Sequence, residues 1–201
     1  MQKIWLFIPV LALSVLMAHC VPGKDLGSPI GQLKTADLIY LAATPDEVID
    51  VVLALRAGGH DAPILGGDGF DAADLWQTHP EISNVFFTTH AYLGAQNNDP
   101  KIVAFRRAFT RTYPGAIPDG FAALGYDAAR LLITAIRRAG STDPQAVRNA
   151  LAGIRRFDGV TGQLGYPAAS RIPVKAVTLL SIEGGGYRLV QQLMPSKTPA
   201  P

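Results

Sequence analysis

Residues 35–194 carry a pattern of apolar and polar positions that predicts strands and helices in alternation. The short apolar run Leu38–Ala42 predicts a strand buried on both faces of a parallel sheet, and Pro63–Leu65 and Val85–Thr88 are predicted to be the next two strands. Apolar residues at helical spacing predict helices at residues 45–57, 72–78, 100–112, 118–139 and 144–151. Near the end, apolar residues on both sides of the turn at Glu183–Gly186 predict a β-hairpin. The pattern therefore predicts an α/β fold, with a parallel sheet flanked by helices and a C-terminal β-hairpin.

The first strand, helix and strand place an acidic loop where ligands often bind. Thr44 is predicted to be the N-cap of the first helix, and Glu47 the other half of a capping box. A right-handed crossover makes the two strands parallel neighbours, so residues 66–70 lie at the carboxyl end of the second strand, where open α/β sheets bind ligands. Asp71 is predicted to be the N-cap of the next short helix. Asp68 is then the carboxylate of this loop that we expect to take part in recognition.

The beginning of the chain has a different character. Lys3 followed by the apolar run Ile4–Ala18 is typical of a secretory signal peptide, so we expect residues 1–20 to direct export. Residues 21–34 contain glycine and proline without periodicity and are interpreted as a linker. The tail at residues 195–201 is expected to be disordered.

Cys20 is the only cysteine of the chain, so no disulfide can form within it. Its place at the end of the predicted signal peptide leaves lipid attachment open, whereas His19 is an unusual residue before a lipidated cysteine. Plain secretion and an uncleaved anchor are the alternatives. In each case we expect a periplasmic or cell-envelope location.

Composition narrows the possible functions. The 201 residues are 48% hydrophobic and 17% charged, which is typical of a folded protein and not of a disordered chain. The formal net charge is +2, from 18 basic and 16 acidic residues, and the basic residues are scattered. No nucleic-acid partner is therefore expected.

The glycine-rich loop GGDGFD matches one turn of a calcium-binding β-roll, but such a site needs several stacked copies and the chain has one. No nucleophile elbow or zinc-protease motif is present, and the histidines share no ligand spacing. We expect no enzyme activity, no metal and no cofactor. An unfamiliar arrangement of Asp68, His90 and Asp127 is the catalytic alternative that stays open.

Several segments, in their order and spacing, resemble the later half of type I periplasmic binding proteins. They are ADLIYLAATPDEVIDVVLALRAGGHDAPILGGDGF, FFTTHAYLG, AALGYDAARLLITAIRRAG, DPQAVRNALAGI and FDGVTGQLGY. More narrowly, they are similar to the branched-chain amino acid (Leu/Ile/Val) substrate-binding components of ABC transporters. The resemblance covers nearly all of residues 31–190.

This resemblance implies a two-lobed fold that closes over an amino acid and delivers it to a membrane permease. Asp68 matches the acidic position that receives the ligand's ammonium group. Thr44 matches a ligand-contacting position that is usually a larger aromatic residue, and Phe121 matches an apolar contact to the ligand side chain. Each also has a structural interpretation: a turn-stabilising Asp, an N-cap and a core phenylalanine.

Members of this family are far longer than the present chain, so we expect a partial domain at residues 35–194, with the first lobe largely missing. The predicted function is a truncated substrate-binding component for branched-chain or related amino acids. The alternative is a non-transporting envelope protein, or a remnant, that binds no solute. In that case another copy, or a separate front-half chain, would cover apolar helix residues such as Leu131, Leu132 and Ile136.

Overall fold

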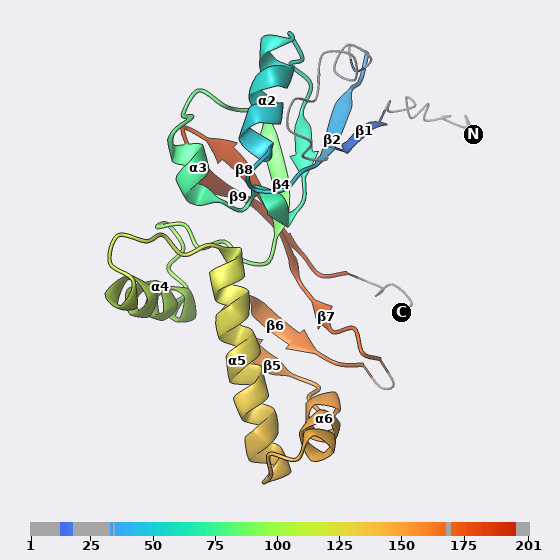
Figure 1. The fold of residues 1–201 in the computed structure, drawn as a ribbon, viewed down its shortest axis with the longest axis vertical. Helices are drawn as coiled ribbons and strands as arrows, with labels where there is room; N and C mark the ends of the chain where they lie inside the picture. The colour runs from blue at the N-terminus through green and yellow to red at the C-terminus, as the bar shows by residue number, and fades with distance from the viewer. Residues whose placement is uncertain (1–12, 18–32, 34, 168–169, 196–201) are drawn as a thin grey trace, which may run out of the picture.

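The structure of this chain is a computed structural model that describes residues 13–17, 33, 35–167 and 170–195. Its elements form two parts, which lie one above the other in Figure 1. The upper part is a six-stranded sheet with helices against it, and the lower part combines helices with a three-stranded sheet. Within the described residues, no helix has both the length and the apolar character needed to cross a membrane.

The sheet of the upper part contains strands from both ends of the chain. In spatial order they are β1 (Leu13–Met17), β2 (Leu38–Ala42), β3 (Ile64–Gly66), β4 (Val85–Thr89), β8 (Val177–Glu183) and β9 (Gly186–Leu193). β1 to β4 are parallel, β8 pairs antiparallel with β4, and β9 pairs antiparallel with β8. The predicted parallel strands and hairpin are confirmed. The hairpin extends the parallel sheet, so the whole sheet is mixed.

Helices α2 (Val48–Ala57) and α3 (Ala73–Gln77) pack against this sheet. The predicted apolar face of α2 is buried: Val48, Val51, Val52 and Leu55. The fully buried side chains Ile39 and Leu41 of β2 lie in the same core. Burying an aliphatic side chain of this size contributes about 1.5–3 kcal/mol, so this cluster is the main source of stability in the upper part.

Strand β1 falls within residues 1–20, the predicted signal peptide. It pairs along its whole length with β2, in the register Leu13 with Leu38 to Met17 with Ala42. Part of the predicted signal peptide therefore forms an edge strand in the structure, and its role in export stays a prediction. Cys20, most of the predicted linker at 21–34 and the tail at 196–201 lie outside the described residues.

The lower part begins after β4 and ends where the chain returns to the upper sheet at β8 (Figure 1). Its elements are α4 (Pro100–Thr112), α5 (Gly120–Ala139), α6 (Pro144–Ala152), β5 (Phe157–Gly159), β6 (Gly162–Gly165) and β7 (Val174–Lys175). Each helix has an aspartate N-cap that accepts a backbone N–H: Asp99 for α4, Asp119 for α5 and Asp143 for α6. The helix starts at Pro100 and Pro144 agree with the predictions, whereas α5 begins two residues after the predicted Pro118.

Helix α5 buries only part of its predicted apolar face. Ala123 and Ala135 are fully buried, and Leu131 packs against a small cluster with α6 and β5. Leu132 and Ile133 are 50% and 48% exposed. The expectation that some apolar helix residues lack cover is confirmed for Leu132.

The first helix starts later than predicted. Residues 45–47 form a turn, and α2 begins at Val48. The Thr44 hydroxyl donates to Glu47 Oε2 at 2.8 Å, and the Thr44 N–H donates to the same oxygen at 3.4 Å. Glu47 therefore reaches back as a capping box requires. The N-cap assignment of Thr44 is wrong, because its hydroxyl is used as a donor to Glu47 and caps no helical N–H.

Candidate functional site

Asp68 lies at the carboxyl end of β3, in the short 3₁₀ helix η1 (Asp68–Phe70). Two glycines let this turn fold tightly. A β-carbon at Gly66 would overlap the Phe70 ring, and one at Gly69 would overlap the carbonyl oxygen of Ala43. The turn therefore packs against the end of β2, and the Asp68 side chain remains 55% exposed.

The three predicted site residues come from different segments. Asp68 and Thr44 follow neighbouring parallel strands. The backbone of Gly69, next to Asp68, lies so close to Thr44 that an added β-carbon would be 3.7 Å from Thr44 Cα. Phe121 lies in the first turn of α5, in the lower part, and is 44% exposed. The structure thus brings Asp68 and Thr44 together at one end of the sheet. The ligand contacts assigned to all three residues stay predictions.

Two residues on the segments that connect the parts lie beside Asp68. His90 directly follows β4, and its Nε2 atom is 3.5 Å from Asp68 Oδ2. Lys175 ends β7, and its Nζ atom is 3.2 Å from His90 Nδ1 and 3.5 Å from the His90 carbonyl oxygen. An acid, an imidazole and an ammonium group therefore form a row where the chain crosses between the two parts.

Burial affects both nitrogen bases of this row. It lowers the pKa of Lys175 to about 8, with the distant Asp127 carboxylate acting in the opposite direction. Burial and then the charge of Lys175 lower the pKa of His90, against the hydrogen bond and charge of Asp68, which raise it. Both nitrogen bases therefore lose a proton more readily than they would in water.

Lys175 was not among the sequence predictions. It lies 85 residues from His90 in the chain, so spacing gave no signal. Asp127 does not join His90 or Asp68: it is buried on α5 and accepts from Val160 N, Thr161 N and the Thr161 hydroxyl. The arrangement of Asp68, His90 and Asp127 considered from the sequence therefore does not form.

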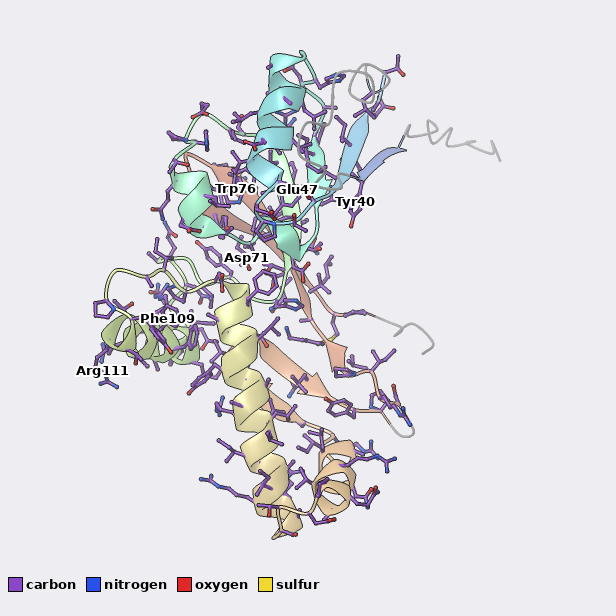
Figure 2. All side chains as sticks on the ribbon, viewed as in Figure 1. Tyr40, Glu47, Asp71, Trp76, Phe109 and Arg111 are labelled. Carbon is purple, nitrogen blue, oxygen red and sulfur yellow. The ribbon has the colours of Figure 1, made fainter. Side chains whose placement is uncertain are left out.

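Asp71 joins the two parts of the molecule, and its predicted role as N-cap of α3 is wrong. Its Oδ2 atom accepts from the Thr89 hydroxyl at the end of β4 and from Gly120 N, at 3.0 Å, at the start of α5. Figure 2 shows Asp71 directly above the first turn of α5. The N-cap position of α3 is Ala72, and no side chain caps this helix.

The environment of Asp71 is unusual for a carboxyl group. The side chain is 3% exposed, and this burial raises its pKa to about 6, although the hydrogen bond from Thr89 lowers it. Burial, with a smaller contribution from the Asp71 charge, also raises the pKa of the Tyr187 hydroxyl above its usual range. The carboxyl group of Asp71 therefore titrates closer to neutral pH than an exposed aspartate does.

A cavity of about 1000 Å³ lies between α3 in the upper part and α4 in the lower part. Its wall includes Asp71, Tyr187 and three arginines of α4, one of which, Arg111, is labelled in Figure 2. Arg106 is held by the carbonyl oxygens of Leu93, Gly94 and Asn97. Asp68, Thr44 and Phe121 do not line this cavity, so it is separate from the predicted site. In the described part of the chain, no three acidic, histidine or cysteine side chains are placed to hold a metal ion.

Solved structures with this fold include two amino-acid-binding proteins. The chain is 27% identical to a leucine-binding protein, LivK, from Thermotoga maritima, with a TM-score of 0.75. The match covers 86% of this chain and 50% of LivK. The chain is 28% identical to the branched-chain amino acid transporter substrate-binding protein LivJ from Streptococcus pneumoniae, solved in complex with isoleucine. There the TM-score is 0.75, and the match covers 88% of this chain and 51% of that one.

The curated relatives agree with these structures. A Leu/Ile/Val-binding protein homolog of Brucella suis is 25% identical over 175 residues, which are 84% of this chain and 46% of the relative. The chain therefore spans about half the length of the relatives it matches. The family model described as periplasmic binding protein matches residues 15–186. With its α/β fold and these neighbours, the chain belongs to the type I periplasmic binding protein family.

Proposed function

We propose that this chain belongs to the substrate-binding component of an ABC transporter for branched-chain or related amino acids. The observation that carries the proposal is the exposed carboxylate of Asp68 at the carboxyl end of a parallel strand. It matches the position that takes the ammonium group of the ligand, and ligands of open α/β sheets bind at this end of the strands. The leucine- and isoleucine-binding neighbours support the same ligand class.

The other parts of the site follow from this proposal. A carboxylate at Asp68 would accept charge-assisted hydrogen bonds from the ammonium group, which gain strength when water is excluded. Thr44 would line the same end of the sheet, and Phe121 would meet the ligand's apolar side chain from α5. The protein would bind its solute without converting it. Its partner would be a membrane permease, reached from the periplasm or cell envelope after export by the signal peptide, with or without a lipid on Cys20.

The test is a thermal melt of the full chain, followed by circular dichroism, with and without L-leucine and L-isoleucine. A ligand at about 100 times its dissociation constant adds about 2.7 kcal/mol to the unfolding free energy. We expect a higher melting temperature with ligand, and loss of this increase in Asp68→Asn. Asp74→Asn is the matched control, because it removes an exposed carboxylate from nearby α3. A melt that moves with neither amino acid contradicts the proposal.

A second candidate is association with another chain. Leu132 and Ile133 of α5 are about half exposed, and so are Leu193 and Met194 at the end of the hairpin. Adjacent exposed apolar side chains, such as Leu132 and Ile133, favour a protein partner. A second copy of this chain, or a separately encoded front-half chain, would cover the face of α5. In that case stable complexes form and Asp68→Asn leaves them unchanged.

A further inference from the structure

The two parts of the molecule carry opposite charges. Residues 90–176, which form the lower part, contain 12 arginines and lysines and five aspartates, for a formal charge of +7. Residues 35–89 and 177–195, which form the upper part, contain two arginines and ten carboxylates, for a formal charge of −8. The fold therefore gathers basic residues that are scattered along the sequence, and the small net charge of the chain hides a strong polarity.

Ion pairs within the chain do not use up this polarity. Among the described residues, each ion pair of a lysine or arginine joins two groups of the same part: Lys101 with Asp158, Arg130 with Asp127, and Arg188 with Glu183. The ion pair between the parts is that of His90 with Asp68. In the described chain, no lysine or arginine of the lower part is therefore paired with a carboxylate of the upper part, and both charges are available to a partner.

The far end of the lower part is basic. Five exposed arginines lie on the last turn of α5, on α6 and just after α6: Arg137, Arg138, Arg148, Arg155 and Arg156. Figure 1 shows α6 and this end of α5 at the bottom, away from the upper part. Leu132 and Ile133 lie about one turn earlier on α5 and are 50% and 48% exposed. This end therefore offers apolar contacts beside a charged rim, as many protein interfaces do.

The opposite end of the molecule is acidic. Asp61 and Glu81 are exposed and precede β3 and β4, whose carboxyl ends face the lower part. Both residues line one surface pocket at the end of α2, so they lie close together. Arg56 lines this pocket as well, but it is partly buried and donates to backbone carbonyl oxygens. The exposed charge of this end is therefore negative.

We propose that a second copy of this chain binds antiparallel to the first, so that the basic end of each copy meets the acidic end of the other. The two contacts are then identical and related by a two-fold axis, as in most homodimers. Exposed ion pairs contribute little individually, so the dimer depends on many of them and on the apolar residues beside the arginines. The inference goes beyond the proposed function, because it does not depend on a solute at Asp68.

The experiment is sedimentation velocity on the full chain at about 1 to 100 μM protein, in about 50 mM and about 500 mM NaCl. We expect an equilibrium between monomer and dimer. The dissociation constant should be at least about tenfold higher in the concentrated salt, because salt screens exposed charges. A chain that is monomeric in both salts, or a dimer that salt does not weaken, overturns the inference.

Paired charge reversals test the arrangement itself. Arg137→Glu with Arg138→Glu reverses the basic end, and Asp61→Lys with Glu81→Lys reverses the acidic end. Each double variant alone should dimerise about 10- to 100-fold more weakly, because its two ends then carry like charges. In an equimolar mixture both contacts again join opposite charges, so a mixed dimer should form within about threefold of the original affinity. A mixture that stays monomeric overturns the inference.

The matched control is Arg107→Glu with Arg111→Glu, which changes the net charge equally but lies on α4, away from both ends. It should weaken the dimer by less than about threefold, and a loss as large as that of the α5 variant overturns the assigned contact. Circular dichroism melts check that every variant is folded.

Two other results also contradict a closed dimer of this kind. One is a series of species that grows beyond the dimer with concentration, which indicates a contact that does not close. The other is a monomer that sediments with phosphatidylglycerol vesicles, which makes an anionic lipid surface the partner of the basic end. Each of these failures leaves the proposed function standing, because the melt with L-leucine and L-isoleucine measures solute binding separately.

Discussion

The titration of Asp71 makes a measurable prediction about stability and pH. Burial raises the pKa of this carboxyl from 3.8 to about 6, so the folded chain binds the proton more tightly than the unfolded chain does. Stability linked to Asp71 therefore increases as the pH falls through about 6, and is complete below the unfolded pKa of about 4. The full difference corresponds to about 3 kcal/mol of unfolding free energy, of which about 1.4 kcal/mol is reached at pH 5.

The assay is urea denaturation at several pH values between about 8 and 5, for the unsubstituted protein and for Asp71→Asn. The asparagine oxygen can still accept from Gly120 N, but the side chain has no charge to lose. Other groups also titrate in this range, including His90, whose lowered pKa acts with the opposite sign. The difference between the two proteins isolates Asp71, and Asp74→Asn controls for net charge.

We expect the unfolding free energy of the unsubstituted protein to rise relative to Asp71→Asn by about 1.4 kcal/mol from pH 8 to pH 5. A difference that stays constant with pH would refute the reasoning. It would mean that Asp71 is as well solvated in the folded chain as in the unfolded one, and that the two parts do not enclose it.

Further substitutions test the packing of α5. Gly120→Ala should destabilise the protein by about 1–3 kcal/mol, because the added β-carbon overlaps the Asp71 carboxylate. A β-carbon added at Gly125, on the same helix, would have no atom within 4 Å, so Gly125→Ala should stabilise the protein by about 0.5–1 kcal/mol. Equal melting temperatures for the Gly120→Ala and Gly125→Ala variants would contradict this prediction. Asp127→Ala should cost about 3 kcal/mol or more in urea unfolding, since buried N–H groups lose their acceptor, and a cost below about 1 kcal/mol would count against that role. Leu132→Glu should shift any self-associated protein towards monomer in light scattering, and an unchanged mass would show that this face is not the interface.

Local patterns were enough to predict most elements of the fold. The helix starts at Pro100 and Pro144 were predicted because an aspartate N-cap and a proline in the first turn act within a few residues. Strand β2 was predicted with its observed bounds because its apolar run is continuous, although only one of its faces is fully buried. Such features depend on neighbours in the chain, so the sequence alone contains them.

Asp71 shows why the same reasoning fails elsewhere. It lies just before a helix, as Asp99 and Asp143 do, and local propensity predicts the same N-cap role. The Asp71 Oδ2 atom instead accepts hydrogen bonds from Gly120 N, 49 residues away, and from the Thr89 hydroxyl. The contact between the two parts overrides the local preference. The approach of Lys175 to His90 is likewise a product of the crossing strands, which no spacing in the sequence records.

Both sets of polar contacts lie where the chain crosses between its parts, and a physical reason connects them. Asp71 accepts the first N–H of α5, a donor that no residue of the helix itself can satisfy. Asp68 and Lys175 present their charges on the same junction, from η1 and from the end of β7. A solute bound at Asp68, as proposed, would contact the η1 turn, which directly precedes the carboxylate that holds the start of α5. Ligand binding and the relative position of the two parts are then linked, and each must favour the other by the same free energy.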